Sequence, residues 1–193
     1  MLDELVRLQV PATFFVQGRW AEAFPALTRR IADEGHLVGS HTFYHARVPL
    51  LTPDGLAEDL RETERVMREV AGLDPRPWFR LPFGAGADNG AIVERLGGLG
   101  YRHVGWDAEL YEWEPGRTSD EVARRAIEGG AAHGDGAIVL FHTWPDPVAP
   151  ALAAIVEGLR ARGMRFVRVD ELGAPDDLSP IGNPRPPVAA PIA

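Results

Sequence analysis

The chain has 193 residues, of which 45% are hydrophobic and 25% are charged, so it can bury the core of one ordinary globular domain. A formal net charge of −8, with no stripe of Lys and Arg, argues against a nucleic-acid-binding protein. The absence of cysteine excludes disulfides and thiolate metal sites, and leaves histidine and carboxylate side chains as the strong metal ligands. No run of about 18 apolar residues is present, so no membrane-spanning helix is predicted.

The first half of the chain alternates helical and strand-like segments. Apolar spacing and Gly or Pro breakers predict, in chain order, a helix over 2–9, a strand at 12–16, a helix over 20–33, a strand at 37–39 and a helix over 52–70. Thr52 and Pro53 are residue types favoured at the N-cap and the first turn of the last of these helices.

The second half continues the alternation. The same signals predict a strand running into the loop at 78–84, a helix over 89–97, a strand at 101–106, a helix over 118–133, a strand at 137–141, a helix over 150–162 and a strand at 165–169. Residues 173–193 are rich in Pro, Gly and Ala and predict a disordered tail, so we expect a single domain over 1–172.

Strand and helix follow one another about six times, which predicts an α/β fold with a parallel sheet covered by helices, either open or closed into a barrel. In both forms, ligand chemistry gathers at the carboxyl ends of the strands. Polar side chains follow four successive predicted strands, namely His41 and His45, Arg80, Asp107 with Glu109, and His142.

A short segment, Gly39-Ser40-His41-Thr42-Phe43-Tyr44-His45, is the strongest functional signal in the chain. Its two histidines lie four residues apart in a loop that follows a strand. Neutral imidazole is the commonest metal ligand in proteins, and two at short spacing are typical of the first half of a zinc-type site. The alternative is a surface or hydrogen-bonded pair without a metal.

Two other strand ends carry candidate catalytic groups. His142 follows the apolar strand at 137–141 and is either a hydrogen-bonded core histidine or a general acid or base. Arg80 either pairs with a surface acid or holds a catalytic carboxylate by two hydrogen bonds.

The default interpretation of the acids after the strand at 101–106 is a solvated acidic loop. They are Asp107, Glu109, Glu112 and Glu114. The nearby tryptophans fill the core or, if exposed beside a cleft, form platforms for sugar rings. These are Trp106, Trp113 and Trp144.

Taken together, the pattern resembles the polysaccharide deacetylases, the NodB-homology domain of carbohydrate esterase family 4, over about residues 1–172. His41-Thr-Phe-Tyr-His45 matches the His-Ser/Thr-x-x-His metal motif, and Arg80-Leu-Pro-Phe83-Gly84 matches the Arg-x-Pro-Tyr/Phe-Gly motif. Glu109 to Trp113 resembles the motif Asp-x-x-Asp-Trp, and Leu140-Phe-His142 matches Leu-x-His. The resemblance implies a distorted NodB-type (β/α) barrel and a metal-dependent hydrolase that removes N-acetyl or O-acetyl groups from a carbohydrate polymer.

The resemblance also implies a metal site and its supporting residues. His41 and His45 would bind a divalent metal, usually zinc in related proteins, and Thr42 would brace their loop. Arg80 would orient the catalytic aspartate. Phe83 would line the groove, and its backbone N–H would help to hold the oxyanion.

The remaining implied roles concern proton transfer and the acetyl group. His142 would be the general acid that protonates the departing amine, and a carboxylate at Glu109 would tune it. Trp113 would form part of the acetyl pocket. Both acids of this motif are glutamates here, Glu109 and Glu112, and the extra methylene moves the carboxylate by about one bond length.

The family's first strand carries Thr-Phe-Asp-Asp, which supplies the base and the third metal ligand, and this sequence has no such motif. Asp3 and Glu4 fall on a predicted helix and do not replace it. We therefore expect a chain that begins after the first strand, binds metal weakly and has little activity. A non-catalytic glycan-binding domain of the same fold is the main alternative, and a different barrel hydrolase with a two-histidine metal site is a third.

Several properties stay open at this point. Peptidoglycan, chitin oligomers, xylan esters and small cyclic amides are all substrates of the family that the chain resembles. No basic segment followed by an apolar one marks a signal peptide, although members of the family are often exported. The sequence indicates neither the compartment nor the oligomeric state.

Overall fold

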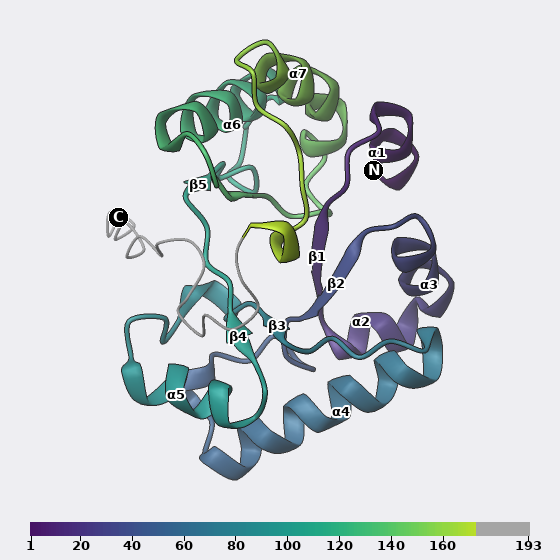
Figure 1. The fold of residues 1–193 in the computed structure, drawn as a ribbon, viewed down its shortest axis with the longest axis vertical. Helices are drawn as coiled ribbons and strands as arrows, with labels where there is room; N and C mark the ends of the chain where they lie inside the picture. Colours follow the sequence, from purple (N-terminus) through teal and green to yellow (C-terminus); the bar gives the residue numbers. More distant parts are fainter. Residues whose placement is uncertain (173–193) are drawn as a thin grey trace. The chain divides into compact units, whose positions relative to one another are not determined.

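A computed structural model describes residues 1–172 of the chain (Figure 1). These residues form two compact units, each described here by itself. The sheet unit is Thr13–Gly105, and the helical unit is Met1–Ala12 with the described part of Trp106–Gly173. Both contain parallel strands and helices, which confirms the predicted α/β class.

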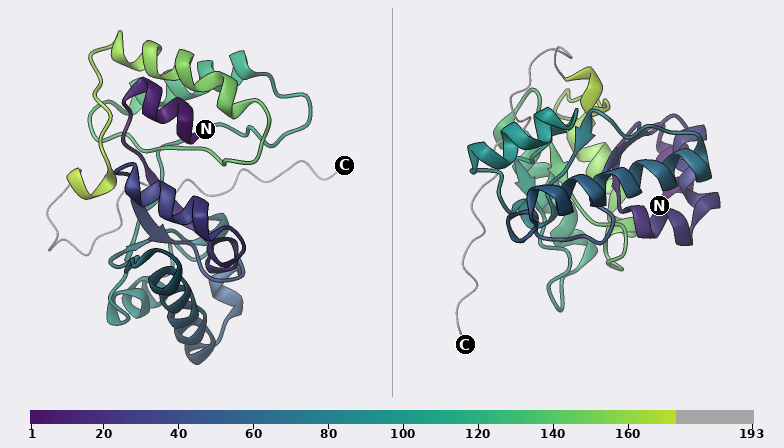
Figure 2. Two further views of the ribbon diagram at one scale, coloured as in Figure 1. Left: turned by 90° about the vertical axis from the view of Figure 1, so that its right-hand side faces the viewer. Right: turned by 90° about the horizontal axis from the view of Figure 1, so that it is seen from below.

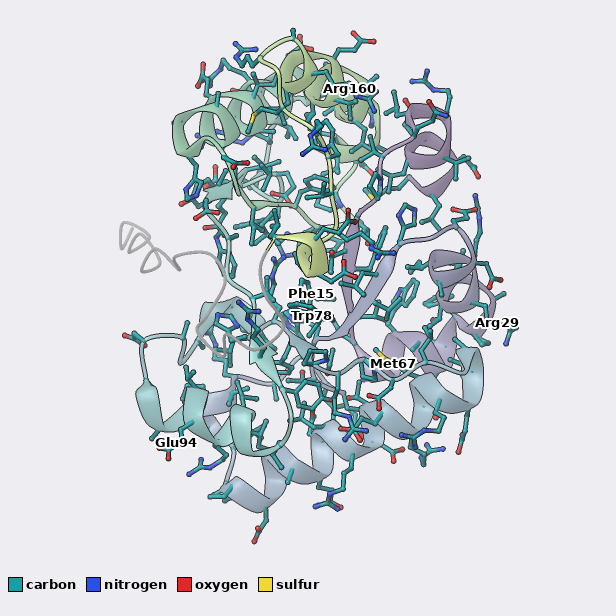
Figure 3. The ribbon with its side chains drawn as sticks, in the orientation of Figure 1. Phe15, Arg29, Met67, Trp78, Glu94 and Arg160 are labelled. Atoms are coloured by element: carbon teal, nitrogen blue, oxygen red, sulfur yellow. The ribbon has the colours of Figure 1, made fainter. Side chains whose placement is uncertain are left out.

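The sheet unit is built on four parallel strands in the order β1-β2-β3-β4. They are β1 (Thr13–Val16), β2 (Leu37–Ser40), β3 (Trp78–Phe79) and β4 (Arg102–His103). Phe15 lies opposite Gly39, where an added Cβ would approach the Phe15 ring to 2.8 Å, so the glycine lets the ring lie against β2 (Figure 3). The four strands lie in the sheet in the same order as in the sequence.

Helices α2 (Gly18–Ala23), α3 (Pro25–Asp33), α4 (Pro53–Ala71) and α5 (Gly90–Gly98) belong to the same unit. Both α2 and α3 pack against α4, the long helix that lies across the right-hand view of Figure 2. The Thr52 hydroxyl caps α4 by accepting a hydrogen bond from the Gly55 backbone N–H, as the sequence predicted. Aliphatic and aromatic side chains fill the core between α4, α5 and the sheet, namely Val48, Leu56, Leu60, Phe79, Leu81, Ile92, Leu96 and Tyr101.

The single helix predicted over 20–33 is wrong, because the structure has two helices that meet at Phe24 and Pro25. Proline has no N–H to donate, and it disfavours the helical conformation in the residue before it. Phe24 accordingly leaves helical geometry, with φ −128° and ψ 58°.

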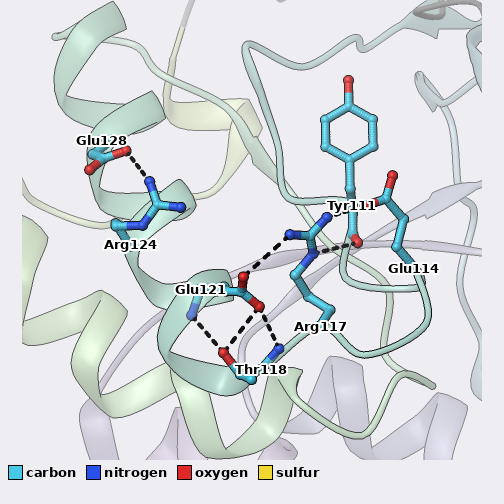
Figure 4. Close-up of polar contacts among 7 residues, drawn as sticks. All are labelled: Tyr111, Glu114, Arg117, Thr118, Glu121, Arg124 and Glu128. Atoms are coloured by element: carbon cyan, nitrogen blue, oxygen red, sulfur yellow. Dashed lines mark hydrogen bonds and ion pairs between the residues drawn. The ribbon is translucent and has the colours of Figure 1, made fainter.

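The helical unit contains α1 (Leu2–Leu8), α6 (Ser119–His133), α7 (Val148–Arg160) and a pair of parallel strands, β5 (Ala108–Glu109) and β6 (Val139–Leu140). Helix α7 packs against both α6 and α1. At the start of α6, Thr118 and Glu121 exchange hydrogen bonds in a capping box, and Arg117 and Glu114 form an ion pair beside it (Figure 4). Such a box satisfies N–H groups that the first helical turn leaves without partners.

Two sequence predictions fail in this unit. The predicted strand at 137–141 is reduced to β6, whose two residues are only partly buried. No strand forms at 165–169 within the described residues, and the Arg168 backbone N–H donates to a Glu171 carboxylate oxygen of the short 3-10 helix Val169–Glu171. An extended segment becomes a strand only when a second extended segment forms backbone hydrogen bonds with it.

The predicted tail, 173–193, lies outside the described residues. Within residues 1–172, no helix combines the length and apolar character needed to cross a membrane.

Candidate active site

The two histidines of the sheet unit face each other in the loop that follows β2. His41 continues the pairing of β2 with β1, because its N–H donates to the Val16 carbonyl. The chain then turns through Thr42 at φ 63° and His45 at φ 58°, a left-handed backbone conformation that residues other than glycine rarely adopt. This turn brings the Nε2 atoms of His41 and His45 to 3.1 Å from each other.

The donor set of this pair fits part of a divalent metal site. The Nδ1 atom of His41 lies 2.8 Å from the Arg80 carbonyl oxygen, which only accepts, so Nδ1 carries the proton and Nε2 of the neutral ring keeps its lone pair. Two nitrogen ligands of a tetrahedral zinc lie roughly 3.3 Å apart, close to the spacing here. Residues 1–172 hold no group of three or more His, Cys, Asp or Glu that could surround a metal ion, so this pair would supply two ligands.

Buried contacts hold the loop between the histidines. Thr42 is fully buried, and its hydroxyl accepts a hydrogen bond from the Ala46 backbone N–H at 3.2 Å. A carboxylate oxygen of Asp59, on α4, accepts from the Phe43 N–H at 2.7 Å. Burial raises the pKa of Asp59, while the backbone N–H groups of Phe43 and Tyr44 lower it by stabilising the anion.

Arg80 is a buried cation next to this loop. Its Nε donates to the Val104 carbonyl at 3.1 Å, its Nη2 donates to the Gly105 carbonyl at 2.9 Å, and its guanidinium lies 4.3 Å from the centre of the Phe15 ring. Burial lowers the pKa of Arg80 to about 9, because removal from water disfavours the charged form. The surface ion pair that the sequence left open is therefore not its environment, and its role toward a catalytic aspartate stays a prediction.

Phe83 lies beside the histidine pair. It adopts φ 60° in the 3-10 turn Pro82–Gly84, and 52% of its surface is exposed. Its ring centre lies 4.5 Å from the ring centre of His45 and 4.0 Å from the guanidinium of Arg47. An exposed aromatic ring against a candidate metal ligand can form the wall of a substrate groove, the role predicted for Phe83.

In the helical unit, His142 has a buried carboxylate partner. The His142 Nδ1 atom lies 2.8 Å from Oε1 of Glu112, and the same oxygen accepts the His142 backbone N–H. The Glu112 side chain is fully buried, and its Oε2 has no hydrogen-bond partner among the described residues. Glu112 therefore holds the Nδ1 side of the His142 ring.

Aromatic rings surround His142. The Trp113 ring stands nearly perpendicular to the imidazole, at 86° with 5.0 Å between ring centres, and the Trp144 ring lies 6.2 Å away. Trp144 is 69% exposed and Trp113 is 37% exposed, whereas Trp106 is buried. Of the three tryptophans, Trp113 and Trp144 can therefore meet a ligand, and Trp106 belongs to the core.

Part of the sequence matches a known protein family. The family model described as polysaccharide deacetylase matches residues 1–104, more than half of the sequence. The chain belongs to the polysaccharide deacetylase family. The matched segment contains the histidine pair, Arg80 and Phe83.

Curated relatives of the chain carry names from the same family. A peptidoglycan-N-acetylglucosamine deacetylase of Bacillus cereus is 28% identical over 89% of the chain, and the chain spans 62% of that relative's length, less than two thirds. A chitooligosaccharide deacetylase of Rhizobium leguminosarum bv. trifolii is 32% identical over 84% of the chain and 79% of the relative.

Solved structures of the family match the fold of the chain over 89% of its length. A deacetylase named T48, solved with substrate, is 34% identical with a TM-score of 0.79 over 81% of its chain. An acetyl xylan esterase of family 4 from Clostridium thermocellum, solved with a cobalt ion, is 29% identical with a TM-score of 0.78 over 80% of its chain. A family 4 pseudoenzyme from Bacillus anthracis is 25% identical with a TM-score of 0.80 over 58% of its chain.

The sequence analysis missed the hydrogen-bond partner of His142. Glu109 was expected to tune His142, but the hydrogen-bond partner is Glu112. Glu109 lies on β5, where burial raises its pKa and a hydrogen bond from the Trp106 side chain lowers it, with smaller opposing effects of the Glu112 and His142 charges. The available signal was the motif itself, because Glu112 is the acid directly before Trp113.

The solvated-loop interpretation holds for one acid of this segment and not for others. Glu114 is exposed and pairs with Arg117. Asp107 is only 4% exposed, and its Oδ2 accepts the Ile138 backbone N–H at 2.8 Å while its Oδ1 lies 3.3 Å from Nδ1 of His133. Asp107 therefore links the ends of β5 and β6, which is a structural role.

Proposed function

We propose that the chain is a metal-dependent hydrolase that removes N-acetyl groups from an N-acetylated polysaccharide or oligosaccharide. The observation that carries the proposal is the pair of imidazole Nε2 atoms, 3.1 Å apart, with one ring fixed by a carbonyl at its other nitrogen. A hydrogen bond at the far nitrogen is the usual support of a metal-binding histidine. The names of the peptidoglycan and chitooligosaccharide deacetylases support an acetylated amino sugar as the substrate.

In this proposal His41 and His45 hold the metal ion, with zinc as the expected metal. When bound, such an ion supplies Lewis acidity toward the acetyl carbonyl group. The exposed Phe83 ring forms a wall beside His45, and the loop backbone at Phe83 offers an N–H to the developing oxyanion. Arg80 is buried and held by two backbone carbonyls, and it would orient the catalytic aspartate of the family, which these residues do not supply.

His142 transfers a proton to the leaving amine. Because its Nδ1 faces the Glu112 carboxylate, the orientation of the imidazole is fixed, so the proton leaves from Nε2. The perpendicular Trp113 ring limits the space beside the imidazole, which suits a small group such as acetyl. In this proposal Glu112 takes the tuning role that the resemblance placed at Glu109.

The Thr-Phe-Asp-Asp motif does not occur in the 193 residues, so these residues alone supply neither its base nor its third ligand. We therefore expect weak metal binding and slow acetate release from a protein of this sequence. Similarity to a family 4 pseudoenzyme favours a second candidate function, a non-catalytic glycan-binding domain that keeps the groove. The retained set His41, His45, Arg80 and His142 favours the hydrolase, because glycan binding alone does not require all four.

The two functions are separated by measuring acetate release from N-acetylglucosamine oligomers and from peptidoglycan, with added Zn²⁺ or Co²⁺ and with a chelator. The hydrolase predicts metal-stimulated, chelator-sensitive release that is lost in His41→Ala and His142→Ala. Glycan binding measured by calorimetry without any acetate release, and unchanged in His41→Ala, would establish the second function.

A further inference from the structure

We propose that Asp59 is a positioning residue that holds the loop between His41 and His45 so that their Nε2 atoms converge. This inference rests on the proposed role of the two histidines as metal ligands. Asp59 lies on α4, outside the motif that carries the histidines, and its carboxylate reaches the middle of that loop.

Asp59 holds the N–H side of the loop. One of its oxygens accepts the Phe43 N–H at 2.7 Å, and the Tyr44 N–H also bonds the carboxylate. These are two of the three N–H groups between the histidines. A carboxylate that accepts backbone N–H groups forms charge-assisted hydrogen bonds, which are about twice as strong as neutral ones.

The start of α2 holds the carbonyl side of the same loop. The Gly18 N–H donates to the Thr42 carbonyl at 3.0 Å, and the Arg19 N–H donates to the Phe43 carbonyl at 3.2 Å. Phe43 is 5% exposed, and its ring occupies the space where a Cβ on Gly18 would lie 2.4 Å from the ring. The loop is thus fixed from α2 on one side and by Asp59 on the other.

The loop needs such support because its geometry is unfavourable by itself. Thr42 and His45 both adopt positive φ, and non-glycine residues stay in that region only where surrounding contacts impose it. Without Asp59, two loop N–H groups lose their acceptor and the backbone is free to relax. The imidazole nitrogens lie 3.1 Å apart because the backbone of the loop brings its two end residues, His41 and His45, together.

The first test needs no metal. In wild-type protein, NMR should give a nuclear Overhauser effect between the His41 and His45 ring protons, because the ring centres are 4.8 Å apart. Asp59→Ala should abolish this effect and speed amide hydrogen exchange of Phe43 and Tyr44 at least tenfold, and Asp59→Asn, which keeps one acceptor oxygen, should give an intermediate result. The matched control is Thr52→Ala, which removes the N-cap of the same helix and should change neither measurement by more than twofold.

The second test is Co²⁺ affinity, measured by absorbance titration. Loss of a supporting contact typically weakens metal binding 10- to 100-fold, so we expect a decrease in that range for Asp59→Ala and less than twofold for Thr52→Ala. An Asp59→Ala protein that keeps the ring contact, or loses it without loss of affinity, overturns the proposal. If Asp59→Ala does not fold, Asp59→Asn decides by the same criteria.

The failure of the proposed function is a different result. If wild-type protein shows the ring contact and Asp59→Ala loses it, but neither binds Co²⁺, the positioning role stands and the metal role of the histidines is wrong.

Discussion

At the scale of single residues, the Glu112–His142 pair makes the sharpest prediction. Glu112→Gln keeps the shape of the side chain but replaces a charged acceptor of the His142 Nδ1–H by a neutral one. We expect kcat for acetate release to fall about 10- to 100-fold, with KM nearly unchanged, because the contact assists proton transfer rather than binding. Steady-state kinetics, with circular dichroism as a check on folding, measure this.

The matched control for Glu112 is Glu114→Gln, two residues along the chain. Glu114 is exposed and pairs with Arg117, and an ion pair with a solvent-exposed carboxylate contributes little. Its substitution should leave kcat within twofold of wild type. Equal losses in the two variants would show that the segment tolerates no change, and the role of Glu112 in proton transfer would then have no support.

Trp144 makes a second prediction at this scale. Its ring is 69% exposed and lies 6.2 Å from the His142 ring, where it can stack on a sugar. An aromatic contact is worth about 1 kcal/mol, so Trp144→Ala should raise KM for a glycan about fivefold and change kcat little. Leu50→Ala, at a residue 80% exposed in the sheet unit, is the control; a KM increase in both variants, or in neither, would remove Trp144 from the binding surface.

At the scale of elements, close packing around the histidine loop predicts a strong contrast between two glycines. A Cβ on Gly18 would lie 2.4 Å from the Phe43 ring, so Gly18→Ala forces buried groups apart and should cost about 1–3 kcal/mol. A Cβ on Gly97, in α5, meets nothing within 4 Å, so Gly97→Ala should raise stability by up to about 1 kcal/mol. Urea unfolding followed by circular dichroism measures both, and a stabilising Gly18→Ala would show that the loop can move aside.

Elements are also where the sequence analysis reaches its limit. Capping residues are local, and the start of α4 followed from Thr52 as predicted. Strands depend on partners distant in the sequence, so β5 was missed and the segment at 165–169 was assigned wrongly. The partner of His142 is likewise 30 residues away, and the motif spacing alone did not distinguish Glu112 from Glu109.

At the scale of the whole molecule, the α/β class followed from the alternation of strands and helices, and the family followed from four motifs spread over the chain; both are confirmed. The sequence could indicate which residues carry chemistry, because metal ligands and proton donors belong to few residue types. It could not indicate burial. Arg80 and His103 are both enclosed in the sheet unit, and nothing in their local sequence distinguishes them from basic residues at the surface.

The burial of His103 predicts how the stability of the chain depends on pH. His103 is 1% exposed, and its pKa is lowered to about 4, first by burial and then by the positive charge of Arg80. The unfolded chain, with an ordinary value near 6.5, therefore binds the proton more readily than the folded one. The stabilisation is complete above about pH 6.5 and is lost progressively as the pH falls toward 4.

Linkage gives the size of this effect. Between pH 7 and pH 5, His103 alone should lower the free energy of unfolding by about 2 kcal/mol. In His103→Asn, which keeps an acceptor for the Leu81 N–H bonded by the imidazole, that contribution disappears. We expect the variant to be less stable at pH 7, because it fills the site less completely, but to lose less stability on acidification. Urea unfolding of both proteins at the two pH values measures the difference. If both proteins lost the same free energy of unfolding between pH 7 and pH 5, the pKa of His103 would be the same in the folded and the unfolded chain, and the prediction would be wrong.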